Sequence, residues 1–184
     1  MNKIFAIFIG MLLAFLAVFV LVPQAVSMLG YSGEAFLGGD LWRIVSFPLA
    51  HVSMAHLLEN IVGLLIIVLL AYELELTALE FSLVFALSGI AVAFIGGLFV
   101  PYLVIVGSSL GIYSLFGALS FKPQDFVPKY LFLTVFGIII FLNIAYNIYS
   151  GKEVVQPAYH AAGFAAGAVV FRLKSIRRKK RILQ

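Results

Sequence analysis

The sequence predicts an all-α membrane protein, and three observations support that prediction. The 184 residues are 64% hydrophobic and only 11% charged, with a mean hydropathy of +1.15, whereas an average soluble domain is about half apolar and about a quarter charged. The apolar residues form six stretches separated by charges, proline and glycine. Little chain remains outside them, so we expect one domain that works within or beside the bilayer.

The six stretches are the expected membrane segments, because a spanning helix needs ~20 apolar residues. The first follows Lys3 and therefore also resembles a signal peptide, but its apolar run of about 20 residues exceeds the usual 7–15 and favours a retained span. We expect a membrane domain over residues 1–173 and a basic tail over residues 174–184. The stretches cover about residues 4–29, 54–72, 79–99, 108–121, 127–149 and 157–173.

The basic residues predict the orientation of the chain. Seven of the twelve lie between Arg172 and Arg181, directly after the last apolar stretch, where such clusters bind anionic lipid head groups rather than nucleic acid. With six spans, both termini lie on the same side of the membrane. If that side is the cytoplasm, ten basic residues lie inside and only two, Arg43 and Lys152, lie outside, which agrees with the positive-inside rule. We expect cytoplasmic termini, and the small size favours a prokaryotic plasma membrane.

The fourth stretch is too short to cross the membrane. Pro101 and the glycines after it disfavour a continuous helix from residue 101. A helix from Ser108 to Phe121 has about 14 residues and a length of ~20 Å, against a hydrocarbon core of ~30 Å. Its N-terminus is then expected part-way down the membrane, where free N–H groups favour negative charge. Ser109 would stand there, either as a helix cap or beside an oxyanion site.

The last stretch brings a histidine towards this helix start. Gly163 and Gly167 give it a face of small residues that allows close helix packing, and His160 lies one turn earlier. A histidine within hydrogen-bond reach of a serine forms a nucleophile–base pair, although helix packing alone also explains the glycines. The fourth stretch is the natural partner, because it carries three glycines: Gly107, Gly111 and Gly117.

Other polar residues interrupt the apolar stretches and mark candidate positions for function. Apart from Glu59, no acidic residue stands beside the three histidines at ligand spacing, so we expect no metal and no cofactor. The absence of cysteine excludes thiol nucleophiles and disulfides. The remaining candidates are His51, His56, Glu59 and Asn60 near the second stretch, Ser108 and Tyr113 in the fourth, and Asn143 and Asn147 in the fifth.

Three separated motifs occur in order along the chain. Trp42-Arg43 precedes a His-x-x-x-x-His-x-x-x-Asn pattern over residues 51–60. Residues 107–110 read Gly-Ser-Ser-Leu, and residues 160–167 read His-x-x-Gly-x-x-x-Gly. Together they resemble the rhomboid family of intramembrane serine proteases, over most of the chain from Trp42 to Phe171. The resemblance implies a six-helix rhomboid-like bundle with a short, partly submerged fourth helix.

The resemblance also implies a function and a set of site residues. The protein would be a serine endopeptidase that cleaves transmembrane segments of membrane proteins. The substrate segment would enter between the second and fifth spans. Ser109 would be the nucleophile and His160 its general base, with Tyr113 stacked on the imidazole to orient it. His56, Asn60 and the Ser109 N–H would hold the oxyanion.

Two features of the resemblance leave alternatives open. Trp42 and Arg43 would brace the loop after the first span, with Arg43 paired to an acidic residue or to loop carbonyls. Leu110 stands where the family motif has glycine, which favours the alternative of a weak or inactive rhomboid-like protein that binds membrane-protein clients. Ser108 is the alternative nucleophile.

Overall fold

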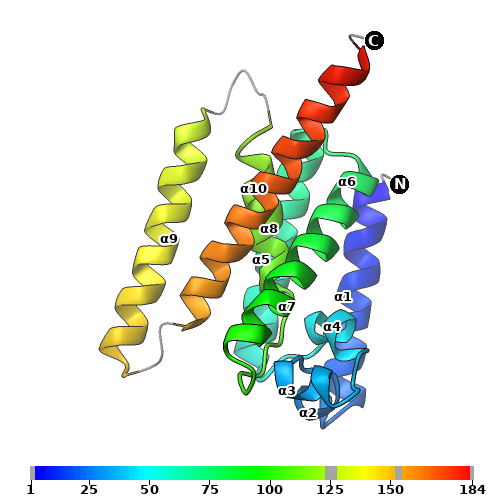
Figure 1. Ribbon diagram of the computed structural model, residues 1–184, viewed down its shortest axis with the longest axis vertical. Coiled ribbons are helices and arrows are strands. Elements are labelled where there is room, and N and C mark those ends of the chain that lie inside the picture. The colour runs from blue at the N-terminus through cyan, green and yellow to red at the C-terminus, as the bar shows by residue number, and fades with distance from the viewer. Residues whose placement is uncertain (1–2, 123–127, 152–154, 183–184) are drawn as a thin grey trace.

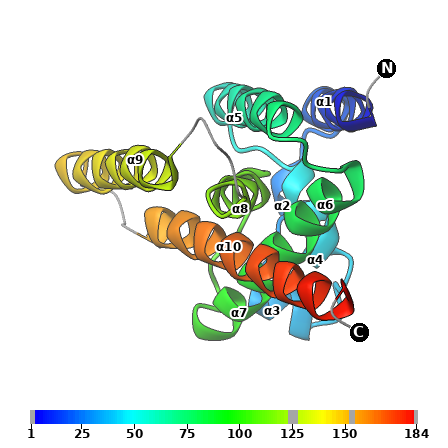
Figure 2. The same cartoon turned by 90° about the horizontal axis from the view of Figure 1, so that it is seen from above.

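The computed structural model describes residues 3–122, 128–151 and 155–182, which fold into a bundle of helices (Figure 1). Within these residues, four helical segments are long and apolar enough to cross a membrane: Lys3–Leu21, Met54–Glu73, Ala78–Phe99 and Tyr130–Tyr149. The fold is therefore an all-helical membrane fold, and the count of six spans stays a prediction. Figure 2 shows α8 between α5 and α10, with α9 at one edge of the bundle.

The first apolar stretch is not one helix, contrary to the sequence-based expectation. Helix α1 (Lys3–Leu21) ends just before Pro23, which has no N–H to donate and disfavours a helical conformation at the residue before it. The chain then forms short helices at one end of the bundle (Figure 1). These are α2 (Ala25–Leu29), α3 (Gly33–Leu37), α4 (Arg43–Ser46) and the 3₁₀ turn η1 (Phe47–Leu49).

Two long helical segments follow, close to their expected bounds. Helix α5 (Met54–Glu73) begins at Ser53, whose side chain caps the helix by accepting the His56 N–H. The next segment begins with a capping box between Thr77 and Glu80. It consists of α6 (Ala78–Leu83), the π-helical turn η2 (Val84–Ser88) and α7 (Gly89–Phe99).

Helix α8 (Ser109–Leu119) is short, as the sequence predicted. Its 11 residues span only ~16 Å. The chain before it is not helical, and it is joined to the loop after α2 by an isolated bridge between Tyr31 and Ile105. Buried backbone outside a helix needs such partners, and here the Tyr31 and Ile105 amides and carbonyls satisfy each other.

The last two helices are α9 (Lys129–Tyr149) and α10 (Val155–Ile182). Helix α10 is longer than the expected segment of residues 157–173, because no glycine or proline interrupts residues 174–182. The predicted tail thus continues the helix in its backbone. The first turn of α1 and the last turn of α10 lie at the same end of the bundle, opposite α2 and α3 (Figure 1).

Two clusters of buried apolar side chains hold these elements together. The first joins α1, α5, α6 and α8 through residues such as Phe15, Leu64, Phe81 and Leu115. The second cluster joins residues 25–49, which we call the α2–η1 region, to α7 and α8. Its members include Tyr31, Phe47, Ala93, Ile105 and Leu110. The start of α8 is therefore fixed on one side by the second cluster.

Candidate active site

Ser109 and His160, the predicted nucleophile and base, lie next to each other. Ser109 is the first residue of α8, and His160 lies in the second turn of α10. The His160 Nε2 is 3.1 Å from the Ser109 Oγ. This is hydrogen-bond distance, so the arrangement allows the imidazole to accept the hydroxyl proton.

The close packing of α8 on α10 produces this distance. A Cβ atom added to Gly167 would overlap the backbone carbonyl of Ser114, and one on Gly117 would overlap the carbonyl of Phe164. A Cβ on Gly163 would lie 3.0 Å from the Leu110 carbonyl oxygen. The two backbones therefore touch, and at positions 117 and 167 only glycine permits this contact.

The other two glycines of the fourth stretch do not face α10, contrary to the sequence-based expectation. A Cβ on Gly111 would lie 2.5 Å from the Phe85 ring of η2. Gly107 precedes α8 and has a φ of +88°, so it turns the chain into the helix rather than packing helices. A Cβ on Gly107 would lie 2.7 Å from the His56 imidazole. Gly107 therefore makes room for a predicted oxyanion donor.

His56 and Asn60 lie one turn apart on α5, beside this turn. The Asn60 Nδ2 donates to the His56 carbonyl at 2.8 Å, and the Asn60 Oδ1 accepts from the Ser108 hydroxyl at 2.9 Å. The amide has a second N–H hydrogen available for a ligand. Ser108, the alternative nucleophile, is engaged with α5, and the imidazole lies against Ser109 instead.

Tyr113 stacks on the His160 imidazole. The ring centroids are 4.3 Å apart and the planes meet at 19°. The His160 Nδ1 is buried and has no hydrogen-bond partner among the described residues. In a Ser-His-Asp triad a carboxylate at this nitrogen orients the ring, whereas here the face of Tyr113 packs against the imidazole.

A cavity of about 370 Å³ opens at Ser109, and we call it the site cavity. Its lining comes from α5, α8, α9 and α10 and includes Ser109, His160, His56, Asn60 and Tyr113. Asn143 also lines it, while Asn147 does not. The sequence reasoning gave no role to two further polar lining residues, Glu59 and Gln156. The sequence held one indication for Glu59, a charge within an apolar stretch, and no indication for Gln156.

His51 lies outside the site cavity and outside the long helices. Its ring lies 5.2 Å from the rings of both Phe15 and His56, and its Nδ1 is 3.2 Å from the Leu49 carbonyl oxygen. Burial lowers the pKa of the His51 imidazole to about 4, and the nearby His56 acts in the same direction. His51 is therefore neutral at physiological pH and packs behind His56.

A family model for the rhomboid domain matches residues 38–176, well over half of the chain. The chain belongs to the rhomboid family. This confirms the resemblance drawn from the three motifs, all of which lie within the match. Rhomboids are generally intramembrane serine proteases that act on transmembrane substrates, and the apolar helices identify this member as an integral membrane protein.

This rhomboid has Leu110 where the family motif has glycine, and its side chain is buried. Leu110 is 2% exposed and packs in the second apolar cluster with Tyr31 and Phe47. It is not part of the lining of the site cavity. The leucine therefore fills the space between α8 and the α2–η1 region, without reducing the cavity in front of Ser109.

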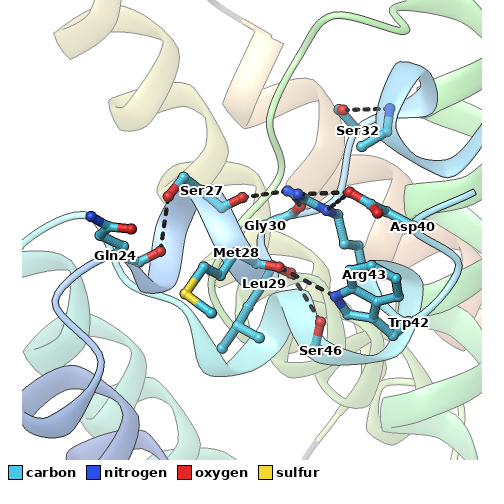
Figure 3. Close-up of polar contacts among 11 residues, drawn as sticks. Gln24, Ser27, Met28, Leu29, Gly30, Ser32, Asp40, Trp42, Arg43 and Ser46 are labelled. Atoms are coloured by element: carbon cyan, nitrogen blue, oxygen red, sulfur yellow. Dashed lines mark hydrogen bonds and ion pairs between the residues drawn. The ribbon is translucent and has the colours of Figure 1, made fainter. Parts of the chain in front are cut away.

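The Trp-Arg pair of this rhomboid connects the α2–η1 region internally (Figure 3). Arg43 forms an ion pair of 2.8 Å with Asp40 and also donates to the carbonyls of Ser27 and Gly30. It thus contacts both kinds of partner that the sequence left open. The Trp42 indole N–H donates to the Met28 carbonyl at 3.3 Å. Both side chains satisfy backbone carbonyls near the end of α2.

Proposed function

We propose that this rhomboid is an intramembrane serine endopeptidase that hydrolyses peptide bonds in transmembrane segments of other proteins. The observation that carries the proposal is the 3.1 Å separation between the Ser109 Oγ and the His160 Nε2 at the start of α8. Serine is a weak nucleophile unless a base takes its proton. The position of both residues in the lining of the site cavity gives a substrate access to the pair.

The chemistry follows from these positions. The Ser109 Oγ attacks the scissile carbonyl carbon while the His160 Nε2 takes the hydroxyl proton. The carbonyl oxygen becomes an oxyanion, which accepts hydrogen bonds from the Ser109 N–H at the helix start and from His56 and Asn60. His160 then gives its proton to the leaving amine, and water hydrolyses the acyl-enzyme by the reverse sequence.

The supporting residues keep this pair in position. The Tyr113 ring holds the imidazole plane, because the stacked geometry leaves the Nε2 directed at Ser109. Gly107 allows the His56 ring to lie close to the start of α8. Among the described residues no carboxylate bonds to His160, so in this proposal packing preorganises the base.

The substrate enters in this proposal between α5 and α9. Both helices contribute to the lining of the site cavity, and α9 stands at the edge of the bundle (Figure 2). A helical substrate has its carbonyls engaged in hydrogen bonds, so the segment to be cut unwinds before Ser109 attacks it. The polar lining residues then offer the freed backbone groups new partners.

The proposed orientation places both termini in the cytoplasm and opens the site to the outside. The shared end of α1 and α10 supports this (Figure 1), because the basic residues after Leu173 then meet the anionic inner leaflet. Helix α5 begins next to the α2–η1 region, at the opposite end of the bundle. His56 and Asn60, near its start, therefore lie towards the outer surface.

Cleavage of a fluorogenic transmembrane substrate in proteoliposomes tests the proposal. We expect Ser109→Ala and His160→Ala each to lower kcat/KM by at least ~1,000-fold, and a fluorophosphonate to label the wild type but not Ser109→Ala. Ser150→Ala is the matched control, because Ser150 is exposed after α9 and does not line the site cavity. Cleavage by Ser109→Ala contradicts the nucleophile assignment. A wild type that neither cleaves nor reacts supports the client-binding alternative.

A further inference from the structure

Glu59 is the only carboxylate among the described residues that line the site cavity, and no lysine or arginine lies among them. It stands on α5 between His56 and Asn60, so it belongs to the same turns as the proposed oxyanion donors. Glu59 follows the first residue of α5 by five residues, a rise of ~8 Å. Because Glu59 and Ser109 line the same cavity, a segment bound at Ser109 lies within the space that the carboxylate borders.

No described basic side chain neutralises this carboxylate. Arg43 forms its ion pair with Asp40 in the α2–η1 region. Lys122 donates to the Leu74 carbonyl, after the far end of α5. An acidic side chain within a membrane segment is costly, and such groups usually pair with another charge or face a water-filled cavity. Glu59 is exposed and borders the site cavity, and none of the described basic side chains lines the space beside it.

Two amides line the site cavity together with Glu59. They are Asn143 on α9 and Gln156 on α10. Their side-chain oxygens accept hydrogen bonds, as does the carboxylate. A bound ammonium or guanidinium group has three or five N–H donors to distribute. One carboxylate with neutral amide acceptors therefore matches a basic side chain in charge and in hydrogen bonding.

We propose that Glu59 selects substrates that carry a lysine or arginine side chain beside the scissile bond. The inference rests on the proposed endopeptidase function and names a substrate class for it. Long basic side chains reach out of a membrane segment towards water, so a lysine near the outer end of a substrate helix is available to the cavity. When the segment unwinds between α5 and α9, the basic side chain leaves its contacts with water and pairs with the Glu59 carboxylate.

The test compares one transmembrane substrate in which each position within about five residues of the cleaved bond carries lysine, glutamine or glutamate. At one or two positions, we expect the wild type in proteoliposomes to cleave the lysine form with a kcat/KM about 5- to 30-fold above the glutamine form, mainly through a lower KM. The glutamate form is expected to be the poorest. In Glu59→Gln the ratio of lysine to glutamine falls towards one, and in Glu59→Lys the preference reverses to glutamate.

Glu34→Gln is the matched control, because it removes the same charge from an exposed position on α3, outside the site cavity. We expect it to keep the lysine preference. Equal cleavage of the three forms by the wild type at every position, or no reversal in Glu59→Lys, overturns the inference while leaving the endopeptidase proposal intact.

A binding experiment separates failure of the inference from failure of the endopeptidase proposal. The Ser109→Ala protein is mixed in nanodiscs with the labelled lysine and glutamine peptides, and their affinities are compared with those of a Ser109→Ala, Glu59→Gln double variant. We expect tighter binding of the lysine peptide only when Glu59 is present. Equal affinities overturn the basic-side-chain preference, whether or not the wild type cleaves any substrate.

Discussion

Helices α9 and α10 both border the site cavity, but they are attached to the rest of the bundle in different ways. Helix α10 lies backbone to backbone on α8 through Gly117, Gly163 and Gly167. Helix α9 is attached through aromatic rings: Phe136 stacks on Phe164 at 3.8 Å, and Phe132 lies against Phe116. Most other large side chains of α9 are exposed, among them Phe141 and Tyr149.

The difference between backbone contacts at α10 and side-chain contacts at α9 predicts different rigidity for the two helices. Backbone contacts leave no rotatable bond to adjust, so α8 and α10 hold Ser109 and His160 at a fixed distance. Rings on side chains change rotamer with little disturbance of the backbone. We therefore infer that α9 can be displaced by an entering substrate while the Ser109–His160 pair stays assembled.

Gly167→Ala is expected to have the largest effect. The added methyl group would overlap the Ser114 carbonyl, so α10 must move away from α8 and the protein loses about 3 kcal/mol or more of stability. Proteolytic activity should be lost with it. Thermal unfolding in detergent and cleavage in proteoliposomes measure the two losses.

The matched control is Gly137→Ala on α9, where an added Cβ meets nothing within 4 Å. There the exchange should leave stability unchanged or raise it by up to ~1 kcal/mol, because alanine favours helix. Equal destabilisation by the two variants would contradict the contrast between α10 and α9.

Gly107→Ala is expected to damage the site more than the fold. Alanine at a φ of +88° is strained, and its methyl group would push the His56 ring away from the start of α8. If His56 is an oxyanion donor, as proposed, its displacement predicts a fall in kcat of about 100- to 1,000-fold. Thermal unfolding should shift by only a few degrees. A variant that retains full kcat would show that His56 is not a donor.

Leu110→Ala is expected to damage the fold more than the site, in contrast to Gly107→Ala. Removal of a buried leucine side chain costs about 2–4 kcal/mol, so the midpoint of thermal unfolding should fall clearly. Because Leu110 does not line the site cavity, kcat/KM per folded molecule should stay within ~3-fold of the wild type. A collapse of kcat/KM without loss of stability would mean that this leucine contacts the substrate.

Phe136→Leu is expected to have the smallest effect of the four. The leucine keeps much of the apolar volume but loses the stacking on Phe164, which predicts a loss of about 0.5–1.5 kcal/mol. A looser α9 should preserve or increase the rate of cleavage, measured with the same transmembrane substrate. Loss of activity at unchanged stability would show that α9 positions the catalytic pair.

The sequence was sufficient for those features that depend on local pattern. Hydropathy located the long helices, and the interval between Pro101 and Lys122 was enough to predict a short α8. The proximity of His160 to Ser109 followed from a glycine face with a histidine one turn away. In each case the signal is a pattern within one short stretch of sequence: an apolar run, an interval between breaking residues, or glycines four residues apart.

The features that the sequence did not predict depend on distant neighbours. The reason for glycine at position 107 is the His56 ring, which lies about fifty residues earlier in the chain. Leu110 stands where the family motif has glycine, and the cluster that buries it includes Tyr31 and Phe47, from a much earlier part of the chain. Gln156 lines the cavity because α10 begins at Val155, before the apolar stretch that the sequence placed at about residue 157. Such relations arise from packing, which no single segment encodes.

The shortness of α8 has a consequence for which bond is cut. If its C-terminal end rests at the inner membrane surface, the ~16 Å length of α8 puts Ser109 near the middle of a ~30 Å hydrocarbon core. The length of the helix thereby sets a depth, and only a bond presented at that depth can reach Ser109, before any flanking residue is recognised. One additional turn in α8 would raise the serine by ~5.4 Å, and the cleavage position in a given substrate would shift outward with it.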